Sequence, residues 1–399
     1  MSAPAVLLEP HRAAPDAPSI EDRVQDVATV AAEHLARHER DATFPTEALD
    51  RMRDTGLLGL LVPRGHGGLG GTSADVIRAG TALGRVDMSV AMILVMHCQQ
   101  VAALVRYAHP RLRDELLPEI AAGRVYLASV TTEAGKGGHL LTSRSALTAH
   151  EDGLAVDRFA PIVTGGEHAD GFLVTMQSPH STSSQDVSLV YAHRDQLKIE
   201  RSGDWEPLGM RSSHSVALRL TGTVPDHQVI GEHGAFRTIV TNVFAPMAHL
   251  GWSACWLGTA AGALSRVVKL LRSPKNRGRA DLDSELLLTR LSRARQRVDT
   301  VHALLEQTRR TVEQAPDLSV PRVQLLLNGL KITAAEQSYR AVDDLVDAVG
   351  MRHGYLKDSP TRLEQSLRDL RSAALNYSND RLHLVDGKLA LLDSEVRLD

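Results

Sequence analysis

The sequence predicts an α+β protein with three consecutive domains: helical, antiparallel β, and helical again in a four-helix-bundle-like arrangement. Over 19–125 and again over 235–399, apolar residues recur three and four positions apart, the spacing of amphipathic helices. Over 126–234 the apolar runs become short, alternate with polar residues and are separated by turn residues, which is typical of strands. Residues 1–18, rich in alanine and proline, are expected to form a flexible tail.

Composition limits the classes of function. The chain has 399 residues, 43% of them hydrophobic, and a formal net charge of −3, which is ordinary for a globular protein and gives no reason to expect nucleic acid as a partner. No apolar stretch reaches the length of about 18 residues that spans a bilayer, and no signal peptide is recognisable, so we expect a cytoplasmic protein. Cys98 and Cys255 have apolar neighbours and are expected to be buried free thiols.

The helical signals of the first domain come in order. Ser19 is placed to cap a helix that begins at Ile20, and Pro45 suits the first turn of the next one. Apolar spacing then predicts helices over 74–83, 89–107 and 110–122.

In the middle domain the run 215–220 alternates, which puts Val216, Leu218 and Leu220 on one face of a strand. Shorter apolar runs predict strands over 171–176 and 187–192, with the polar stretch 178–186 as a surface loop between them. In the third domain, helical spacing covers 261–271, 285–313 and 322–349, bounded by prolines.

A glycine-rich stretch, 65–70, matches G-x-G-x-x-G, and Asp87 follows about 20 residues on, as in a dinucleotide-binding fingerprint. The alternative is a tight loop between helices, in which glycines supply positive φ. Pro63 and Arg64 interrupt the apolar run before the glycines, and no series of βαβ units follows. We therefore favour the loop.

Four segments, in order along most of the chain, resemble motifs of the acyl-CoA dehydrogenase superfamily. They are "FPTEALDRMRDTGLLGLLVPRGHGGLGG" at 44–71, "LASVTTEAGKGG" at 127–138, "WEPLGMRSSHS" at 205–215 and the ending at 354–380. The resemblance implies the fold of that family and a flavin, FAD by the habit of the family with FMN as the alternative, between the β domain and the C-terminal helices.

The same resemblance assigns roles to individual residues. Threonine hydroxyls on a strand suit a flavin ring, whose electronics are tuned by hydrogen bonds at its edge. A glycine-rich turn approaches the pyrophosphate, and a degraded arginine motif faces the cofactor of a neighbouring subunit. Arg368 and Asp369 are also expected to help hold the cofactor. The implied cofactor-binding residues are Ser129, Thr131, Thr132, Thr164, Arg272, Arg277, Gly350, Arg352, Gly354 and Asn379.

The ending departs from the family pattern. Tyr377 stands where most members carry the glutamate that removes the proton alpha to a thioester carbonyl, and the alternative position for that base, 247–249, offers His249 but no carboxylate. Ala160 replaces a usual lysine. Loss of general-base catalysis typically costs about 100- to 10,000-fold in rate. This departure resembles the monooxygenase branch of the superfamily, which uses reduced flavin and dioxygen and needs no such base.

Three functions remain open at this stage: a monooxygenase acting with reduced FAD on a small organic molecule, an acyl-thioester dehydrogenase with a base other than glutamate, and a catalytically silent flavin-fold protein. A separate flavin reductase is a further expected partner, and the resemblance implies a homodimer or homotetramer. His97 is either a core histidine or a pocket residue. No metal-ligand spacing is present. The candidate catalytic residues are His97, His249, Asn376 and Tyr377.

Overall fold

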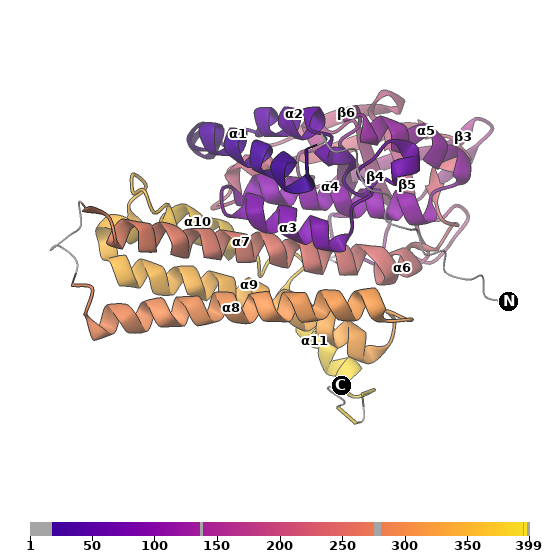
Figure 1. The fold of residues 1–399 in the computed structure, drawn as a ribbon. Helices are drawn as coiled ribbons and strands as arrows, with labels where there is room; N and C mark the ends of the chain where they lie inside the picture. The colour runs from indigo at the N-terminus through magenta and orange to yellow at the C-terminus, as the bar shows by residue number, and fades with distance from the viewer. Residues whose placement is uncertain (1–17, 136–138, 275–280, 394, 397–399) are drawn as a thin grey trace.

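The computed structural model describes residues 18–135, 139–274, 281–393 and 395–396. Most of the predicted tail, together with Gly138 and Arg277, lies outside these residues. In Figure 1 the first helices and the strands form one half of the molecule, and the long helices α7, α8 and α9 run beside one another in the other half. The order helical, β, helical predicted from the sequence is confirmed.

The N-terminal helices begin where the capping residues predict. The Ser19 hydroxyl accepts a hydrogen bond from the Asp22 amide, and the Asp22 carboxylate accepts one from the Ser19 amide, so a complete capping box opens the first helix. Pro45 directly precedes the second helix. The helices are α1 (Ile20–Asp41), α2 (Thr46–Asp54), α3 (Ser73–Gly84), α4 (Met88–Tyr107) and α5 (Pro110–Ala121).

The glycine-rich stretch is a tight loop, as favoured above. It lies in the connection between α2 and α3, which contains two short 3-10 turns, Leu57–Gly59 and Arg64–His66, and among the described residues no strand precedes it. A Cβ on Gly68 would lie 2.2 Å from the Val62 carbonyl oxygen, so a side chain there does not fit. Asp87 caps α4, accepting hydrogen bonds from the Ser89 and Val90 amides, and is buried. The dinucleotide fingerprint is therefore ruled out.

The β domain consists of two four-stranded sheets. The first has the order β1 (Leu127–Val130), β4 (Gly171–Gln177), β5 (Val187–His193), β8 (Val229–Ile230), and the second β2 (Thr148–His150), β3 (Gly153–Ala160), β7 (Ala217–Val224), β6 (Leu197–Ser202). All pairs are antiparallel except β1 with β4. The strand predicted over 215–220 begins later, at Ala217, but Val216, Leu218 and Leu220 are all buried as expected.

The C-terminal helices are α6 (Phe236–Ile239), α7 (Ala245–Leu271), α8 (Glu285–Gln314), α9 (Pro321–Gly350), α10 (Leu363–Arg371) and α11 (Asn379–Ala390), with π-helical turns at Val240–Phe244 and Met351–Tyr355. Helix α7 begins well before the predicted residue 261. One of its faces packs against the N-terminal domain: Cβ atoms on Gly251 and Gly258 would collide with Val95 and with the Thr81 carbonyl. Its opposite face packs on α9.

Two helical segments, Met88–Tyr107 and Phe236–Leu271, are long and apolar enough to cross a membrane by length and composition, which corrects the expectation that no segment is. Their most apolar windows are 83% and 61% buried inside the protein, so packing in the core accounts for that composition. Cys98 and Cys255 lie in the same helices as buried free thiols, as expected. Burial raises the pKa of Cys98 to about 12.

Candidate functional site

Two of the predicted cofactor residues meet at the edge of the β domain. The Thr132 hydroxyl, just after β1, donates a 2.9 Å hydrogen bond to the Ile162 carbonyl in the turn that follows β3. Thr164, two residues further on, has its hydroxyl 3.0 Å from that of Ser215. We call Thr132, Ile162 and Thr164 the hydroxyl wall. Ser129 and Thr131 lie half-buried on the chain segment that leads into it.

The hydroxyl wall has the chemistry that a flavin ring requires. Its two threonines are half-buried, so their hydroxyls are held by the fold and still open on one side. Ile162, between them, is 49% exposed although it is a large apolar residue. A ring with a flat apolar face and polar edge atoms would cover the isoleucine and accept or donate at the hydroxyls. The residues present therefore fit a flavin.

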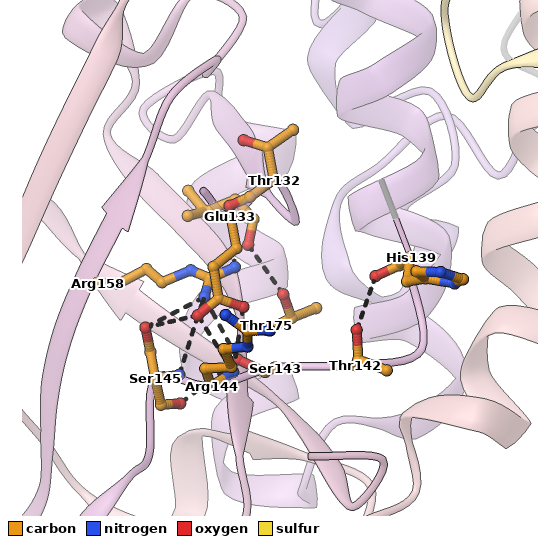
Figure 2. Close-up of polar contacts among 10 residues, drawn as sticks. Thr132, Glu133, His139, Thr142, Ser143, Arg144, Ser145, Arg158 and Thr175 are labelled. Atoms are coloured by element: carbon orange, nitrogen blue, oxygen red, sulfur yellow. Dashed lines mark hydrogen bonds and ion pairs between the residues drawn. The ribbon is translucent and has the colours of Figure 1, made fainter. Parts of the chain in front are cut away.

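A buried ion pair supports the hydroxyl wall from inside the β domain (Figure 2). Arg158 on β3 is fully buried; its Nη1 lies 2.7 Å from Glu133 Oε1, and its Nη2 donates to the Thr132 carbonyl at 2.9 Å. Glu133 also accepts hydrogen bonds from the Ser145 amide and hydroxyl. Burial raises the pKa of Glu133, but the hydrogen bond and charge of Arg158, together with hydrogen bonds from Arg144 and Ser145, hold it below its ordinary value.

Sequence reasoning missed Arg158, although a signal was present. In β3 the residues Leu154, Val156, Arg158 and Ala160 occupy one buried face of the strand, so an arginine stands in an otherwise apolar alternation. Charged residues are almost never fully buried unless they are paired. Arg158 lies on the same face of β3 as Ala160, which stands where the resemblance implies a lysine. A positive charge is therefore present on this face, two residues before that position.

A second candidate region lies near the end of the chain. Residues 373–379, which lead from α10 to the first residue of α11, are here called the C-terminal segment. Tyr377 is half-buried and has a φ of +50°, in the left-handed region. Burial raises the pKa of its phenol, so near neutral pH even less of it is present as the basic phenolate than in an ordinary tyrosine. Asn376, the preceding residue, is half-buried, and its backbone amide donates a hydrogen bond to the Ser372 carbonyl.

A contact joins the β domain to the C-terminal helices near both features. His139 Nε2, in the loop between β1 and β2, lies 3.2 Å from Arg381 Nη1 on α11, four residues beyond Tyr377. Figure 2 shows His139 and Thr142 on the segment that leads to Ser143 and Ser145, beside the Glu133–Arg158 pair. This contact joins the loop that follows Thr132 to the first turn of α11, just beyond the C-terminal segment.

The two candidate histidines are both buried core residues. His97 on α4 is fully buried; its Nε2 donates to the Leu58 carbonyl and its Nδ1 accepts from the Leu127 amide. Neither ring nitrogen is left for a substrate, so the catalytic role predicted for His97 has no geometric support. Burial lowers its pKa to about 4, which keeps the ring neutral. Its contact with Leu127 instead secures the start of β1.

His249 lies on the face of α7 that packs on α9. Burial, and secondly the charge of Lys331, lower its pKa to about 3, opposed by a hydrogen bond with the Leu327 backbone. Its Nδ1 has no hydrogen-bond partner among the described residues. A neutral imidazole with so low a pKa binds a proton weakly, so His249 is a poor substitute for the missing glutamate.

The other predicted cofactor residues do not join the hydroxyl wall. Arg272 ends α7 about 35 Å along the helix from His249, at 1.5 Å per residue. Gly350 and Arg352, both exposed, lie at the same end of the bundle, where Arg290 of α8 bonds the Asp347 carbonyl of α9. Gly354, also in this turn, is buried against Val346.

A cavity of about 970 Å³ opens at this far end, between α7 and α8. Leu264, Val268 and Leu291 give it an apolar floor, while Lys269, Arg272 and Arg295 bring positive charge. An apolar floor with a basic rim suits a ligand that has both a flat apolar group and phosphate.

Three residues of the ending hold the protein together rather than face a cofactor. Arg368 pairs with Glu39 and Glu364 at 2.7 and 2.8 Å, and Asp369 accepts a 2.6 Å hydrogen bond from the Met210 amide. Burial raises the pKa of Asp369 well above its ordinary value. The Asn379 side chain accepts from the Lys331 amine at 2.7 Å. The cofactor contacts expected of these residues stay a prediction, and the contacts described by the structure are within the chain.

The fold and these motifs agree with comparisons to known proteins. Family models of the acyl-CoA dehydrogenase N-terminal and C-terminal domains match residues 15–124 and 240–375, together more than half of the chain. The probable acyl-CoA dehydrogenase fadE25 of Mycobacterium leprae is 22% identical over 364 residues, which is 90% of this chain and 91% of the relative.

Solved structures of two kinds of enzyme share the fold. Dibenzothiophene monooxygenase TdsC from Paenibacillus sp. A11-2 superposes with a TM-score of 0.82 at 20% identity, covering 94% of this chain and 97% of its own. Butyryl-CoA dehydrogenase from Megasphaera elsdenii gives 0.81 at 18% identity, covering 93% and 98%. TdsC has also been solved with FMN and indole. The chain belongs to the acyl-CoA dehydrogenase family of flavin-dependent oxidoreductases.

Proposed function

We propose that this protein is a flavin-dependent monooxygenase that hydroxylates a small organic substrate with reduced flavin and dioxygen. The observation that carries the proposal is the half-buried Tyr377 at the position of the family base, on a segment from 373 to 379 that contains no carboxylate. Its phenol has a raised pKa, and neutral His249 has a pKa lowered to about 3, so neither is suited to remove a proton alpha to a thioester.

The roles of the chain's own residues follow from their contacts. Bound flavin supplies the redox chemistry. Thr132 and Thr164 orient the ring edge through hydroxyls that the Ile162 carbonyl and Ser215 already hold. Arg158 and Glu133 keep the Thr132 backbone in place. Tyr377 and Asn376 line the substrate side, where the phenol excludes water and positions the substrate.

The cofactor we propose is FAD, shared between copies of the chain in a homodimer or homotetramer. The basic cavity at Arg272 lies at the end of α7, about 35 Å along the helix from His249. A second copy would bring its Arg272 end to the first copy's ring site, whereas FMN would leave that cavity without a role. We further propose a cytoplasmic enzyme supplied with reduced flavin by a separate reductase.

The second candidate function is desaturation of an acyl thioester, and one carboxylate favours it. Glu336 on α9 accepts a 3.5 Å hydrogen bond from the Asn379 amide, two residues from Tyr377. Glu336 is half-buried and contacts the C-terminal segment through Asn379. A movement that freed it from Asn379 would supply a base.

The decisive experiment combines the purified protein with reduced FAD, isotopically labelled dioxygen and a panel of small aromatic and aliphatic substrates. We expect a hydroxylated product that carries one labelled oxygen. In parallel, oxidised protein is mixed anaerobically with acyl-CoA esters, and flavin bleaching is followed by absorbance. Bleaching with formation of an enoyl product, abolished in Glu336→Gln and kept in Tyr377→Phe, would replace the monooxygenase proposal by the dehydrogenase.

A further inference from the structure

A fully buried lysine lies beneath the C-terminal segment. Lys331 is in the middle of α9, and its side chain is inaccessible to solvent. The amine donates to the Ala373 carbonyl at 3.1 Å, to the Tyr377 carbonyl at 3.0 Å and to Asn379 Oδ1 at 2.7 Å. All three acceptors belong to residues 373–379, so the three N–H groups of an ammonium ion are used on this segment alone.

This arrangement differs from an ordinary buried lysine. Among the described residues no carboxylate lies within ion-pair distance of the amine, and its other close neighbour is the ring of Trp256, whose centroid is 5.6 Å away. Burial lowers the pKa of Lys331 to about 7, and the more distant Glu336 opposes this only in part. Burying an ammonium without a contacting acid is costly unless its hydrogen bonds are all made.

The residue that this amine holds is under backbone strain. Tyr377 has a φ of +50°, a conformation that costs a non-glycine residue roughly 1–2 kcal/mol. One of the three acceptors is its own carbonyl oxygen. The Ala373 carbonyl lies just beyond the end of α10, where lysine side chains bind free carbonyls favourably. The amine therefore joins the end of a helix to a strained residue.

We propose that Lys331 is a positioning residue that holds the C-terminal segment from below and so sets where the Tyr377 side chain stands at the flavin site. The link to the flavin rests on the proposed function, whereas the hydrogen bonds to residues 373–379 do not. The titratable groups that interact with the amine are His249 from α7 and Glu336 from its own helix, while Tyr377 contacts it through the backbone carbonyl. None of them neutralises it by direct contact.

The first test is hydrogen exchange of the purified full chain, followed on the peptide that covers 372–381. Lys331→Met removes the three hydrogen bonds with little change of volume, and exchange in this peptide should rise about tenfold or more. Lys331→Arg should restore most of the protection. Peptides of α1 should not change, and Lys198→Met, an exposed lysine of β6, is the matched control. Unchanged exchange at 372–381, or an equal rise along the whole chain, would overturn the proposal.

A milder variant covers the case in which Lys331→Met does not fold. Asn379→Ala removes one acceptor and leaves the lysine with two, so we expect a smaller rise that is again confined to 372–381. No rise in this variant counts against the proposal in the same way.

The second test is flavin affinity in both redox states, measured by fluorescence quenching. Lys331→Met should bind about tenfold more weakly and Lys331→Arg close to wild type, whereas a lysine that serves only global stability would leave the affinity of the folded fraction unchanged. If the wild-type protein binds no flavin, the proposed function fails, and the exchange experiment still decides the role of Lys331.

Discussion

The hydroxyl wall and the C-terminal segment each depend on a buried cation, but the two cations have different partners. Arg158 pairs with a carboxylate, Glu133, and also donates hydrogen bonds to the Thr132 carbonyl and to the hydroxyls of Ser143 and Ser145. Lys331 contacts no carboxylate among the described residues. Its amine donates its hydrogen bonds to two backbone carbonyls and one side-chain amide oxygen. One cation is paired with an acid where it lies, and the other is held only by neutral oxygen atoms beneath the residue that stands at the position of the family base.

This difference indicates which part of the site has changed relative to the family. The hydroxyl wall retains threonines at the motif positions and is supported by a charge pair of ordinary kind. The C-terminal segment has exchanged an acidic residue for Tyr377 and holds it in a strained conformation. The residues proposed to hold flavin therefore keep the threonines of the motif, while the segment proposed to contact substrate carries the departure from the family pattern. Three predictions test this division, in addition to the experiments above.

The largest effect is expected from Arg158→Met. The substitution leaves the Glu133 carboxylate buried without its ion-pair partner, and breaking a buried pair costs about 3–5 kcal/mol in the free energy of unfolding. Chemical denaturation measures it. Arg219→Met is the control on the neighbouring strand: its pair with Asp157 is exposed and its loss should cost about 1 kcal/mol or less. Equal losses in the two variants would mean that Arg158 is not a special support of the hydroxyl wall.

The next effect concerns pH and compares the histidine of each region. His97, which secures β1, and His249, beneath the C-terminal segment, have folded-state pKa values lowered to about 4 and about 3. The unfolded chain binds these protons near pH 6.5 and the folded protein does not, so stability is lost as pH falls below 6.5. Each histidine should contribute a loss of about 2 kcal/mol between pH 7 and 5.

Denaturation curves at pH 7, 6 and 5 check this for His97→Gln and His249→Gln. Each variant should show a smaller loss on acidification than wild type, whatever its stability at pH 7. A pH dependence identical to that of wild type would show that the histidine is not neutral and buried in solution.

The smallest effect is expected at the hydroxyl wall itself. Thr164→Val keeps the shape of the side chain and removes the hydroxyl that contacts Ser215. Flavin affinity should fall by about 1 kcal/mol, close to fivefold, since one neutral hydrogen bond is lost. Titration of flavin fluorescence measures it, and Thr223→Val, on β7 of the same domain, is the control. An affinity unchanged in Thr164→Val would remove this hydroxyl from the flavin site.

Local patterns were sufficient for much of the fold. Apolar spacing located α3, α4, α8 and α9 to within a residue or two, and the Ser19 capping box opened α1 where predicted. The start of α7 was missed because residues 245–260 are apolar on nearly all sides, so no periodic contrast marks them. They are apolar because one face packs on α3 and α4 and the other on α9.

Only the part of the candidate site that short sequence motifs mark was predictable from the sequence. Thr132 and Thr164 belong to short motifs, and the structure brings their segments together through Ile162. Lys331 carries no motif: in the sequence it is a lysine in a long helix, where the usual expectation is an exposed side chain. His97 showed the opposite error, because a histidine among apolar residues does not reveal that the Leu58 carbonyl and the Leu127 amide will occupy both its nitrogens.

By itself the sequence determined the order of helical and β domains, the loop nature of the glycine-rich stretch, the flavin motifs and the absence of a carboxylate at Tyr377, because each depends on residue types at short spacing. Only the tertiary structure decided which charges are buried and what they touch. Arg158 meets Glu133 across the β domain, and Lys331 meets residues more than 40 positions further along the chain. Such pairs form when distant segments are packed together, and no local pattern encodes them.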